Sequence, residues 1–588
     1  MNTQNTYQAE VVVVGATPGG IASAVAAARR GRSVLLLERS NHIGGLVANG
    51  LGATDIATRG ATGGLFTQFT GRVKAHYVST YGPESQQVED CSDGYHFEPS
   101  VAERILESFL SERPEVRTLK RRQFDAHPSN VIKDGNRVTG LWVLNLDAGV
   151  REQVIGEMFI DATYEGDLAA AAGVPYRIGR EDQREFNEPM AGHIYKQWIG
   201  EVDPASTGWG DNALQSFNYR LPLTKVAENR VPIAKSATYN RDEYLSLVDD
   251  VKLDRHTQKP GCKHHEWFWD GIGKVVNIVP VPNGKTDANN QHKAFLSTDL
   301  PEENWPWASA GWDWRDRYSV RLREYILGLL WFCQNEPELP EAFRNLCSEW
   351  GLARDEYQDN GHFPRQVYVR EGRRMAGEYL FTAHDALPNG GERPPVHADS
   401  ITASHYALDS HAVRKREPGR VHLEGFFSME TAPYTVPYRV IVPRDVEGLL
   451  VPVAASATHV GFSTLRMEPC WMALGEAAGL AASLAVECST PVRSVSITDL
   501  QAELLQMGAV LFYFKDLAPG HPAYAAFQML GLRGFFPDWE ARPDEPVTAE
   551  ERERWCAMAG IEPPKEQDQT RGMLAAALWA DLSNGQNA

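Results

Sequence analysis

Four consecutive valines, Val11–Val14, are followed at once by a glycine-rich turn and an alanine-rich stretch. A run of β-branched residues is typical of a strand that is buried on both faces of a parallel sheet. The stretch from Ile21 to Arg30 predicts a helix that Gly31 ends, and Val34–Leu37 predicts a second buried strand. Strand, turn, helix and strand within about 30 residues form a βαβ unit, so the chain is expected to adopt an α/β fold of the Rossmann type.

The turn between this strand and the helix matches the dinucleotide fingerprint G-x-G-x-x-G at two of its three glycine positions. Thr17 occupies the place of the middle glycine, which normally lets the backbone approach a pyrophosphate. Gly19 keeps the turn flexible, and we expect the Thr17 hydroxyl to donate to a phosphate oxygen. Glu38 follows Gly15 at the distance where an acid binds the ribose hydroxyls. A Rossmann-like unit that binds no nucleotide is the alternative.

FAD is favoured over NAD as the ligand of this unit. Gly44 and Gly45 directly follow the second strand, and this pair resembles the one that flavoproteins of the glutathione-reductase type carry along their cofactor. No arginine pocket for a 2′-phosphate is evident near the acid, and a second fingerprint for NAD(P)H is not found in the sequence. The residues predicted to bind FAD here are Gly15, Ala16, Thr17, Pro18, Gly19, Gly20, Glu38, Arg39, Gly44, Gly45 and Leu46.

Two later segments are expected to complete the cofactor site. In Met158–Gly173 a short strand leads into Ala162 and Thr163, which resemble the second cofactor motif of FAD oxidoreductases with Tyr164-Glu165 inserted before its glycine. Asp167 is expected to be the N-cap of the helix that follows. In the second segment Leu449–Val453 predicts a buried strand.

A helix is then predicted over Glu468–Val486, with proline in its first turn and a face of small residues that permits close packing. We expect its N-terminus to face the flavin, where a positive helix end and an arginine would stabilise the reduced ring. The residues predicted to contact the cofactor here are Arg466, Met467, Pro469 and Met472.

From Val11 to about Leu505 the chain resembles the large FAD-dependent oxidoreductase family, which is related to the glutathione-reductase-type flavoproteins. Stretches such as GATPGGIASAVAAARRG, HIGGLVANGLGATD, VYVREGRRMAGEYLFT and RMEPCWMALGEAAG carry this resemblance. It implies FAD and a Rossmann-like FAD-binding domain of the glutathione-reductase type. We expect this domain at 1–175 and 438–490, interrupted by a mixed α+β substrate domain at 176–437 and followed by a small helical C-terminal appendage at 491–588.

Eight of the 15 tryptophans lie between residues 198 and 314, among tyrosine, asparagine and histidine. Flat rings next to polar groups suit a polyhydroxylated ligand, although core and lid packing is the alternative. Lys285, Asp287 and Asn290 are expected to contact the substrate from a polar loop that turns at Asn283-Gly284, and a structural hairpin is the alternative. The nearby arginines Arg370, Arg373 and Arg374 predict salt bridges, or else an anionic substrate.

The end of the chain predicts a helical unit over His521–Trp555, with Thr548 capping a helix that has Glu551 three residues on. The net charge of −19 argues against a nucleic-acid partner and therefore against RNA modification. The seven scattered cysteines argue against a disulfide framework and a metal site. We found no signal peptide and no run that is long and apolar enough to span a bilayer, so a soluble cytoplasmic protein is expected.

The predicted reaction is a flavin-dependent oxidation, in which a C–H bond of an alcohol, expected to be sugar-like, delivers hydride to flavin N5. His459 is the candidate base because a histidine pKa lies near working pH; a core histidine is the alternative, and His264 and His265 are second choices. Amine oxidation and C–C desaturation are alternatives on the same flavin, and a non-catalytic carbohydrate-binding protein is an alternative of another class. The sequence leaves open the electron acceptor (oxygen, a quinone or a redox protein) and whether the chain is a homo-oligomer.

Overall fold

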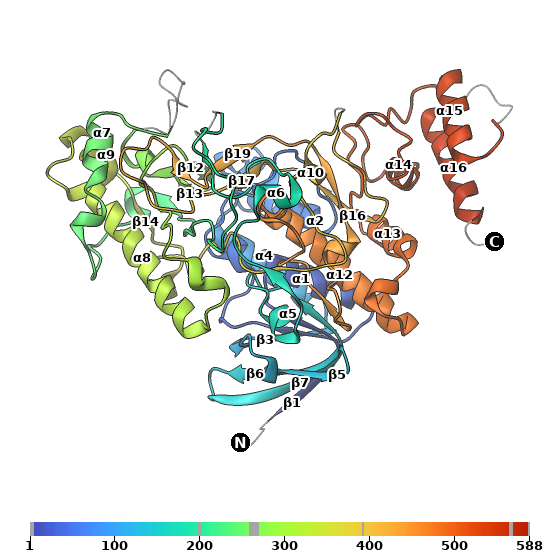
Figure 1. The fold of residues 1–588 in the computed structure, drawn as a ribbon, viewed down its shortest axis with the longest axis horizontal. Helices are drawn as coiled ribbons and strands as arrows, with labels where there is room; N and C mark the ends of the chain where they lie inside the picture. The colour runs from blue at the N-terminus through green and yellow to red at the C-terminus, as the bar shows by residue number, and fades with distance from the viewer. Residues whose placement is uncertain (1–4, 197–200, 258–269, 391–392, 564–568, 586–588) are drawn as a thin grey trace.

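The computed structural model describes residues 5–196, 201–257, 270–390, 393–563 and 569–585 (Figure 1). Its largest sheet is built around β1 (Thr6–Val14), in the strand order β3-β2-β1-β7-β6-β4. The strands β2, β3 and β7 run parallel to their neighbours in the centre of the sheet, whereas β6 is antiparallel to β7. The bounds of these strands are β2 Val34–Leu37, β3 Val116–Leu119, β4 Arg122–Gln123, β6 Arg137–Asn145 and β7 Val150–Asp161.

Two further strands join this sheet: β5 (Val131–Asp134) pairs with β6, and β21 (Leu449–Leu450) pairs in parallel with β7. The predicted βαβ unit is observed, because Val11–Val14 pair in parallel with Val34–Leu37, one residue to one. The late segment around β21 therefore returns to the same sheet as the N-terminus. This parallel-strand sheet confirms the mixed α/β fold that the first forty residues predict.

Helix α1 (Pro18–Arg29) follows β1, and α12 (Glu468–Cys488) packs along it at the centre of the molecule (Figure 1). The small residues of α12 make this contact close, as predicted. A Cβ atom on Gly475 would overlap the carbonyl oxygen of Gly19, and one on Gly479 would overlap that of Ser23. The Ser23 hydroxyl also donates to the Gly475 carbonyl at 2.9 Å. The position of α12 is thus tied to the first turns of α1.

Among the described residues, α12 is long and apolar enough, by length and composition, to cross a membrane. The expectation that no segment of the chain reaches this length and hydropathy was therefore wrong. Buried residues make up 89% of the helix's most apolar window. This burial, against α1 and the sheet, is what the core helix of a globular fold requires.

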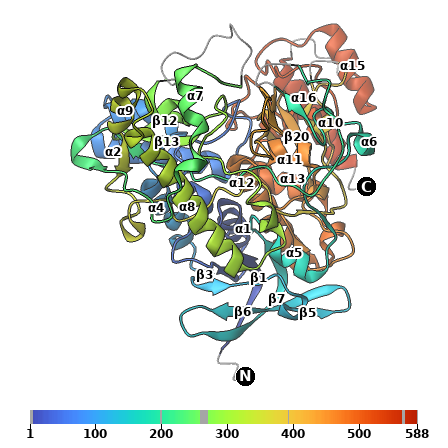
Figure 2. The same ribbon diagram turned by 60° about the vertical axis from the view of Figure 1, so that its left-hand side comes forward.

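A second, antiparallel sheet has the strand order β11-β14-β10-β13-β12 and lies beside α8 (Figures 1 and 2). The hairpin of β12 and β13 turns at Asn283 and Gly284, which both have positive φ. The stretch predicted as a polar loop is therefore a hairpin strand, which was the alternative. The bounds are β10 Leu223–Thr224, β11 Arg230–Val231, β12 Val276–Val281, β13 Lys285–Asn290, β14 Gly351–Ala353 and α8 Trp312–Asn335.

The remaining elements are short pairs of strands and peripheral helices. The paired strands are β8 (Tyr176–Arg177) with β15 (Arg374–Met375), β9 (Tyr195–Lys196) with β18 (Leu423–Glu424), β16 (Ser400–Ser404) with β20 (Tyr434–Pro437), and β17 (Leu408–Ser410) with β19 (Phe427–Met429). The other helices are α2 Leu65–Tyr81, α3 Gln86–Asp90, α4 Pro99–Ser111, α5 Asp167–Ala172, α6 Gln183–Phe186, α7 Ser246–Lys252, α9 Glu341–Ser348, α10 Ala383–Ala386, α11 His459–Leu465 and α13 Ile497–Gln506.

Some local predictions were wrong. The N-cap of α5 is Gly166, and Asp167 is the first helical residue, where it forms ion pairs instead of capping. The last strand of the sheet ends at Leu450, three residues earlier than predicted.

The C-terminal helices α14 (Tyr524–Gly531), α15 (Ala549–Ala559) and α16 (Arg571–Gly585) lie together at one side of the molecule (Figure 1). The predicted capping box is present, since Thr548 and Glu551 exchange side-chain and backbone hydrogen bonds. Phe536 meets Trp555 edge to face with ring centroids 5.1 Å apart. This aromatic packing explains how a short helical unit holds its shape.

Candidate functional site

A cavity of about 380 Å³ opens at the carboxyl end of β1, between the first βαβ unit and α8. We call it the cradle cavity. Its walls come from segments that are far apart in the sequence, between residues 14 and 369. The carboxyl ends of parallel strands are where open α/β sheets bind nucleotides. Six residues of the predicted cofactor site line it: Gly15, Thr17, Glu38, Arg39, Gly45 and Thr163.

The turn before α1 has the geometry that a phosphate cradle needs. Gly15 has a φ of +96°, and a Cβ atom there would lie 2.9 Å from the Ala162 carbonyl oxygen. Among the described residues, the backbone N–H groups of Thr17 and Gly19 have no hydrogen-bond acceptor. Free N–H groups and the positive end of a helix dipole suit a pyrophosphate. The first half of the predicted cradle is therefore present.

Thr17 serves this turn differently from the prediction. Its hydroxyl donates to the Ala162 carbonyl at 2.8 Å and accepts the Gly20 N–H at 3.1 Å, which makes Thr17 the N-cap of α1. A hydroxyl has a single proton to donate. The Thr17 hydroxyl therefore uses its proton for the Ala162 carbonyl, and not for a phosphate oxygen as expected.

Glu38 lies at the end of β2, on the wall of the cradle cavity. One carboxylate oxygen accepts the Ala16 N–H at 3.0 Å, and the other accepts the Ser40 N–H at 2.7 Å. Burial raises its pKa, and these two backbone hydrogen bonds oppose the rise. The carboxylate is thus fixed in orientation, as a group that recognises ribose hydroxyls must be.

The inner end of the cradle cavity is formed by Gly45, Asn49 and Tyr164. The Tyr164 hydroxyl accepts the Leu46 N–H at 3.0 Å and donates to Glu468 Oε1, at the start of α12, at 2.6 Å. Tyr164 belongs to the two-residue insertion in the second cofactor motif. Sequence reasoning recognised this insertion but did not assign Tyr164 a role, because its partners lie about 120 and 300 residues away.

The other predicted cofactor residues do not line the cradle cavity. Ala16, Pro18, Gly19, Gly20, Gly44, Leu46 and Ala162 are buried directly behind its walls. Their contacts are with the protein itself: the Gly44 N–H, for example, donates to the Ala16 carbonyl at 2.7 Å. Arg466, Met467, Pro469 and Met472 are buried at the start of α12 and do not line this cavity.

Aromatic residues from the middle of the chain form the opposite wall of the cradle cavity. Trp307 and Trp312 line it, and Arg39 lies over the Trp312 ring at 4.1 Å. Arg39 also pairs with Asp316 of α8 at 2.6 Å. These tryptophans were assigned to a carbohydrate ligand from the sequence. The structure instead places two of them beside the nucleotide cradle, while Trp198, Trp267 and Trp269 lie outside the described residues.

The arginines Arg370, Arg373 and Arg374 form ion pairs. Salt bridges were one of the two alternatives predicted for them, and an anionic substrate was the other. Arg370 pairs with Asp299 at 2.8 Å, Arg373 with Asp167 at 2.7 Å, and Arg374 with Glu181 at 3.2 Å. All three guanidinium groups are buried. Buried pairs of this kind satisfy their own charges, so they leave little charge over for an anionic substrate.

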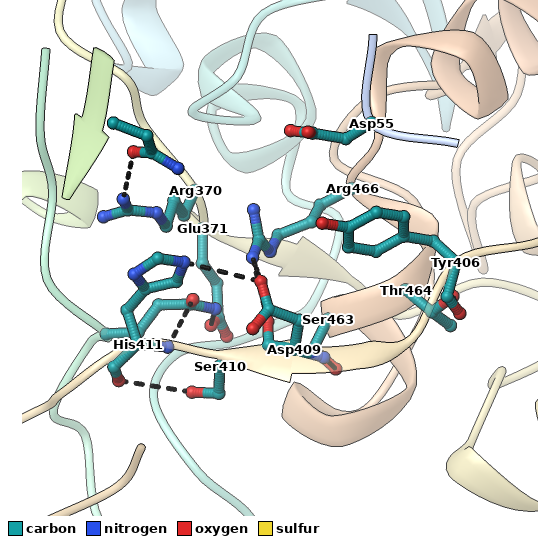
Figure 3. A network of polar contacts seen from close by, with 12 residues as sticks. Asp55, Arg370, Glu371, Tyr406, Asp409, Ser410, His411, Ser463, Thr464 and Arg466 are labelled. Atoms are coloured by element: carbon teal, nitrogen blue, oxygen red, sulfur yellow. Dashed lines mark hydrogen bonds and ion pairs between the residues drawn. The ribbon is translucent and has the colours of Figure 1, made fainter. Parts of the chain in front are cut away.

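Arg466 belongs to a buried polar network next to the start of α12 (Figure 3). It pairs with Asp409 at 3.0 Å and donates to the Tyr368 hydroxyl at 2.8 Å. His411 lies between Asp409, at 3.4 Å, and Asp299, at 2.9 Å. Burial raises the pKa of Asp409, but the neighbouring His411 and Arg466 more than offset this and hold it below its ordinary value. The positive charge of Arg466 is therefore balanced within the protein.

His459 is the first residue of α11, and its side chain is 1% exposed. Its Nδ1 lies 2.8 Å from Glu371 and its Nε2 lies 3.1 Å from the Ser410 hydroxyl. An imidazole that donates to a carboxylate at Nδ1 keeps Nε2 as an acceptor. His459 lines neither of the cavities described here. The second-choice bases His264 and His265 lie outside the described residues.

The three predicted substrate residues on β13 point to different surroundings. Asp287 pairs with Arg220 at 2.6 Å, and it accepts the N–H groups of Gly52 and Ala53. Asn290 accepts from Arg370 at 3.1 Å. Lys285 forms ion pairs with Glu98, Asp355 and Glu356. Asn290 thus lies at the edge of the Arg466 network, through Arg370 and Asp299, whereas Asp287 and Lys285 have partners of their own.

A second cavity, of about 230 Å³, adjoins this network. We call it the side cavity. Asn290 and Asp299 line its polar side, and Phe295 and Phe426 line its apolar side. Asp299 links the side cavity to Arg466, through His411 and Asp409.

The residues of the cradle cavity fit FAD. The free N–H groups at α1 suit the pyrophosphate, and Glu38 suits the ribose. Asn49, which lines the inner end, has a buried polar atom without a hydrogen-bond partner within the protein, and so do Glu468 and Trp471, which contact Tyr164. Buried polar groups are nearly always paired in native structures, so orphaned atoms beside a cavity indicate a polar ligand. Among the described residues no cluster of histidine, cysteine or carboxylate side chains could hold a metal ion.

Comparison with solved structures finds many weak likenesses among flavoenzymes. The quinol fumarate reductase of E. coli is 12% identical, with a TM-score of 0.30, over 99% of this chain and 88% of that one. The FAD complex of glycerol-3-phosphate dehydrogenase from Bacillus halodurans is 11% identical, with a TM-score of 0.22, over 33% of this chain and 44% of that one. The 3-ketosteroid-Δ4-(5α)-dehydrogenase from Rhodococcus jostii is 16% identical, with a TM-score of 0.19, over 30% and 51%.

The chain therefore spans only about half the length of these two dehydrogenases. Likenesses of this strength carry no argument about its substrate. Among curated proteins there is no match.

The model of one protein family, in contrast, matches residues 10–504. This range contains the cradle cavity, the side cavity and the Arg466 network. This match supports an FAD-dependent enzyme and not the alternative, a non-catalytic carbohydrate-binding protein. The chain belongs to the FAD dependent oxidoreductase family.

Proposed function

We propose that this enzyme oxidises an alcohol, of a sugar-like polyhydroxylated class, by hydride transfer from a C–H bond to FAD. When bound, FAD supplies an acceptor for two electrons and one proton at its N5 atom. The observation that carries the proposal is the cradle cavity, because one space is lined by both predicted cofactor motifs and has unpaired donors at its phosphate end. The other steps depend on residues of the chain.

In this proposal the backbone of Thr17 and Gly19 binds the pyrophosphate, and Glu38 binds the adenosine ribose. Arg39, fixed by Asp316, and the rings of Trp307 and Trp312 hold the adenosine end. The start of α12, with Arg466, Met467, Pro469 and Met472, borders the flavin end. Arg466 contributes a fixed hydrogen-bonding group and little net charge, since Asp409 balances its positive charge.

We assign the acceptance of the hydroxyl proton to His459. Glu371 orients the ring through Nδ1, so that Nε2 is the basic atom. The Ser410 hydroxyl, one residue after Asp409 on β17, lies 3.1 Å from this atom and fixes the second side of the ring. His411 is less suited, because its two ring nitrogens already face the carboxylates of Asp299 and Asp409.

The side cavity is the proposed substrate site. Phenylalanine rings on one side and Asn290 and Asp299 on the other suit the C–H faces and hydroxyls of a small polyol. Every residue that lines it falls within 176–437, which supports the proposal that this range forms a substrate domain. Amine oxidation would need a neutral amine beside Asp299, which the same cavity could hold. The substrate panel therefore includes amines.

The test is anaerobic bleaching of bound FAD by a panel of sugars, glycosides, simple alcohols and amines. We expect a polyol or sugar to bleach the parent protein. His459→Ala should retain FAD and bleach about 10²–10⁴ times more slowly, the usual worth of general base catalysis. His384→Ala, at an exposed histidine of α10, is the control and should bleach at the parent rate. An unchanged rate in His459→Ala would remove this residue from the mechanism, and bleaching by amines alone would overturn the alcohol substrate.

A further inference from the structure

Tyr164 joins three segments of the cofactor site through one hydroxyl. It accepts the Leu46 N–H at 3.0 Å and donates to Glu468 Oε1 at 2.6 Å. Its ring packs against Trp471 of α12, with centroids 5.3 Å apart. A Cβ atom on Gly45 would overlap the hydroxyl, so the glycine is required for the contact. Tyr164 therefore fixes the distance between the Gly-Gly pair and the start of α12.

Glu468 has no counter-charge. It is 5% exposed, and among the described residues no cation forms an ion pair with it. Its Oε1 accepts from Tyr164, and its Oε2 has no partner, as is also true of the Trp471 indole nitrogen. Transfer of an unpaired carboxylate into an apolar interior is very costly, so such a group keeps its proton instead. Burial raises the pKa of Glu468 to about 8, in agreement with the contacts.

The charge of this residue matters because of where it lies. Glu468 is the first residue of α12, where the helix dipole is equivalent to about half a positive charge. A carboxylate at this point would cancel that charge, whereas a neutral carboxylic acid leaves it in place. Arg466 does not supply a substitute, because Asp409 neutralises it.

We propose that Tyr164 and Glu468 form an uncharged pair that positions FAD at the inner end of the cradle cavity and preserves the positive end of α12 for the negative charge that the cofactor gains on reduction. The proposal rests on the placement of FAD in the proposed function. It assigns a role to the Tyr164-Glu165 insertion, which departs from the usual form of the second cofactor motif. Both residues are positioning residues, since neither takes part in the transfer of hydride or proton.

The test compares Glu468→Gln, Tyr164→Phe and Glu476→Gln. Glu476 is the matched control, because it is a buried glutamate of the same helix that accepts from the Leu65 N–H and not from Tyr164. FAD affinity is measured by quenching of flavin fluorescence, the flavin midpoint potential by spectroelectrochemistry, and protonated carboxyl groups by infrared difference spectroscopy. The parent is titrated with FAD first.

Glutamine is a neutral isostere, so Glu468→Gln should bind FAD within about threefold of the parent and leave its midpoint potential unchanged. Tyr164→Phe should weaken FAD binding by between about twofold and tenfold, the worth of one hydrogen bond. The infrared carbonyl band of a protonated acid should disappear in Glu468→Gln and shift in Tyr164→Phe. Glu476→Gln should change none of these three quantities except its own band.

A higher midpoint potential in Glu468→Gln would overturn the proposal, because it would mean that a negative charge had been removed. The absence of a carbonyl band that responds to either variant would also overturn it. If Glu468→Gln does not fold, the response of the band in Tyr164→Phe decides. A parent protein that binds no FAD would instead refute the proposed function itself, and the two failures are thus distinguishable.

Discussion

Thr17 stabilises the cradle through one hydroxyl that makes two hydrogen bonds. It caps α1 and closes the gap to the turn after β7 at Ala162. Loss of an N-cap costs about 1 kcal/mol, and loss of a buried donor adds about 1–2 kcal/mol. We expect Thr17→Ala to lower the free energy of unfolding by about 2–3 kcal/mol, as measured by urea denaturation of the apoprotein.

Ser496→Ala provides the comparison, because Ser496 caps α13 without a second contact of this kind. Its cost should be about 1 kcal/mol. FAD affinity of Thr17→Ala should stay within a few-fold of the parent, since the backbone N–H groups are unchanged. A loss of FAD affinity of tenfold or more would support the sequence-based prediction that the Thr17 hydroxyl donates to a phosphate oxygen.

Glu476 predicts a pH dependence of stability. It is buried in α12, where Oε2 accepts the Leu65 N–H at 3.2 Å, and burial raises its pKa from 4.5 to about 7. The native state therefore binds more protons than the unfolded state between about pH 4.5 and pH 7. The stabilisation is complete below pH 4.5 and is lost as the pH rises through 7.

Glu476→Gln should remove this part of the pH dependence. The difference in free energy of unfolding between parent and variant should change in favour of the variant as the pH rises from 5 to 8. Ser496→Ala, which removes no titratable group, should give a difference that is constant with pH. A constant difference for Glu476→Gln as well would show that the residue is charged in the native state.

At the scale of elements, the contact between α1 and α12 depends on glycine. Gly475→Ala would force a methyl group into the Gly19 carbonyl, next to the phosphate end of the cradle cavity. Overpacking of this kind costs about 1–3 kcal/mol or more. We expect a lower melting temperature and a loss of FAD affinity of at least tenfold, because α1 must shift.

Gly71→Ala is the control for this substitution. Gly71 lies in α2, and a Cβ atom there would have no neighbour within 4 Å. The variant should be stabilised by about 0.5–1 kcal/mol through helix propensity. Equal effects of the two alanines would contradict the close contact between α1 and α12.

Elements with strong local signals were predictable from the sequence. The run of valines, the alanine-rich helix and the small residues of α12 define their own conformation and packing face. The β12–β13 hairpin was left open as an alternative, because KTDANN lacks the β-branched residues that mark a strand. The ion-pair partners of Arg370 and Arg374 were not predictable, since Asp299 and Glu181 are distant from them in sequence.

At the scale of the whole molecule, the site depends on contacts that no local pattern records. The phosphate end of the cradle cavity follows from a local motif, and the sequence therefore predicted Gly15 and Glu38. Trp312 reaches the same cavity because α8 begins there, with the Trp312 indole donating to the Phe124 carbonyl at 3.1 Å, and Trp307 lies in the turn just before this helix. Sequence reasoning favoured a sugar ligand for these tryptophans. Tertiary contacts instead place two of them, Trp307 and Trp312, in the wall of the cradle cavity.

This arrangement predicts how FAD changes the dynamics of the molecule. A ligand that binds only the native state, at a concentration of 100 times Kd, stabilises it by about 2.7 kcal/mol. Because α8 lines the cradle cavity, amide hydrogen exchange should slow not only near the turn at Gly15 but also in the first turns of α8, around 312–320. ADP should protect both segments as well, since it carries the phosphates and the adenosine. Helix α15, remote from the cavity, should exchange at an unchanged rate; protection confined to the Gly15 turn would show that α8 does not close over the nucleotide.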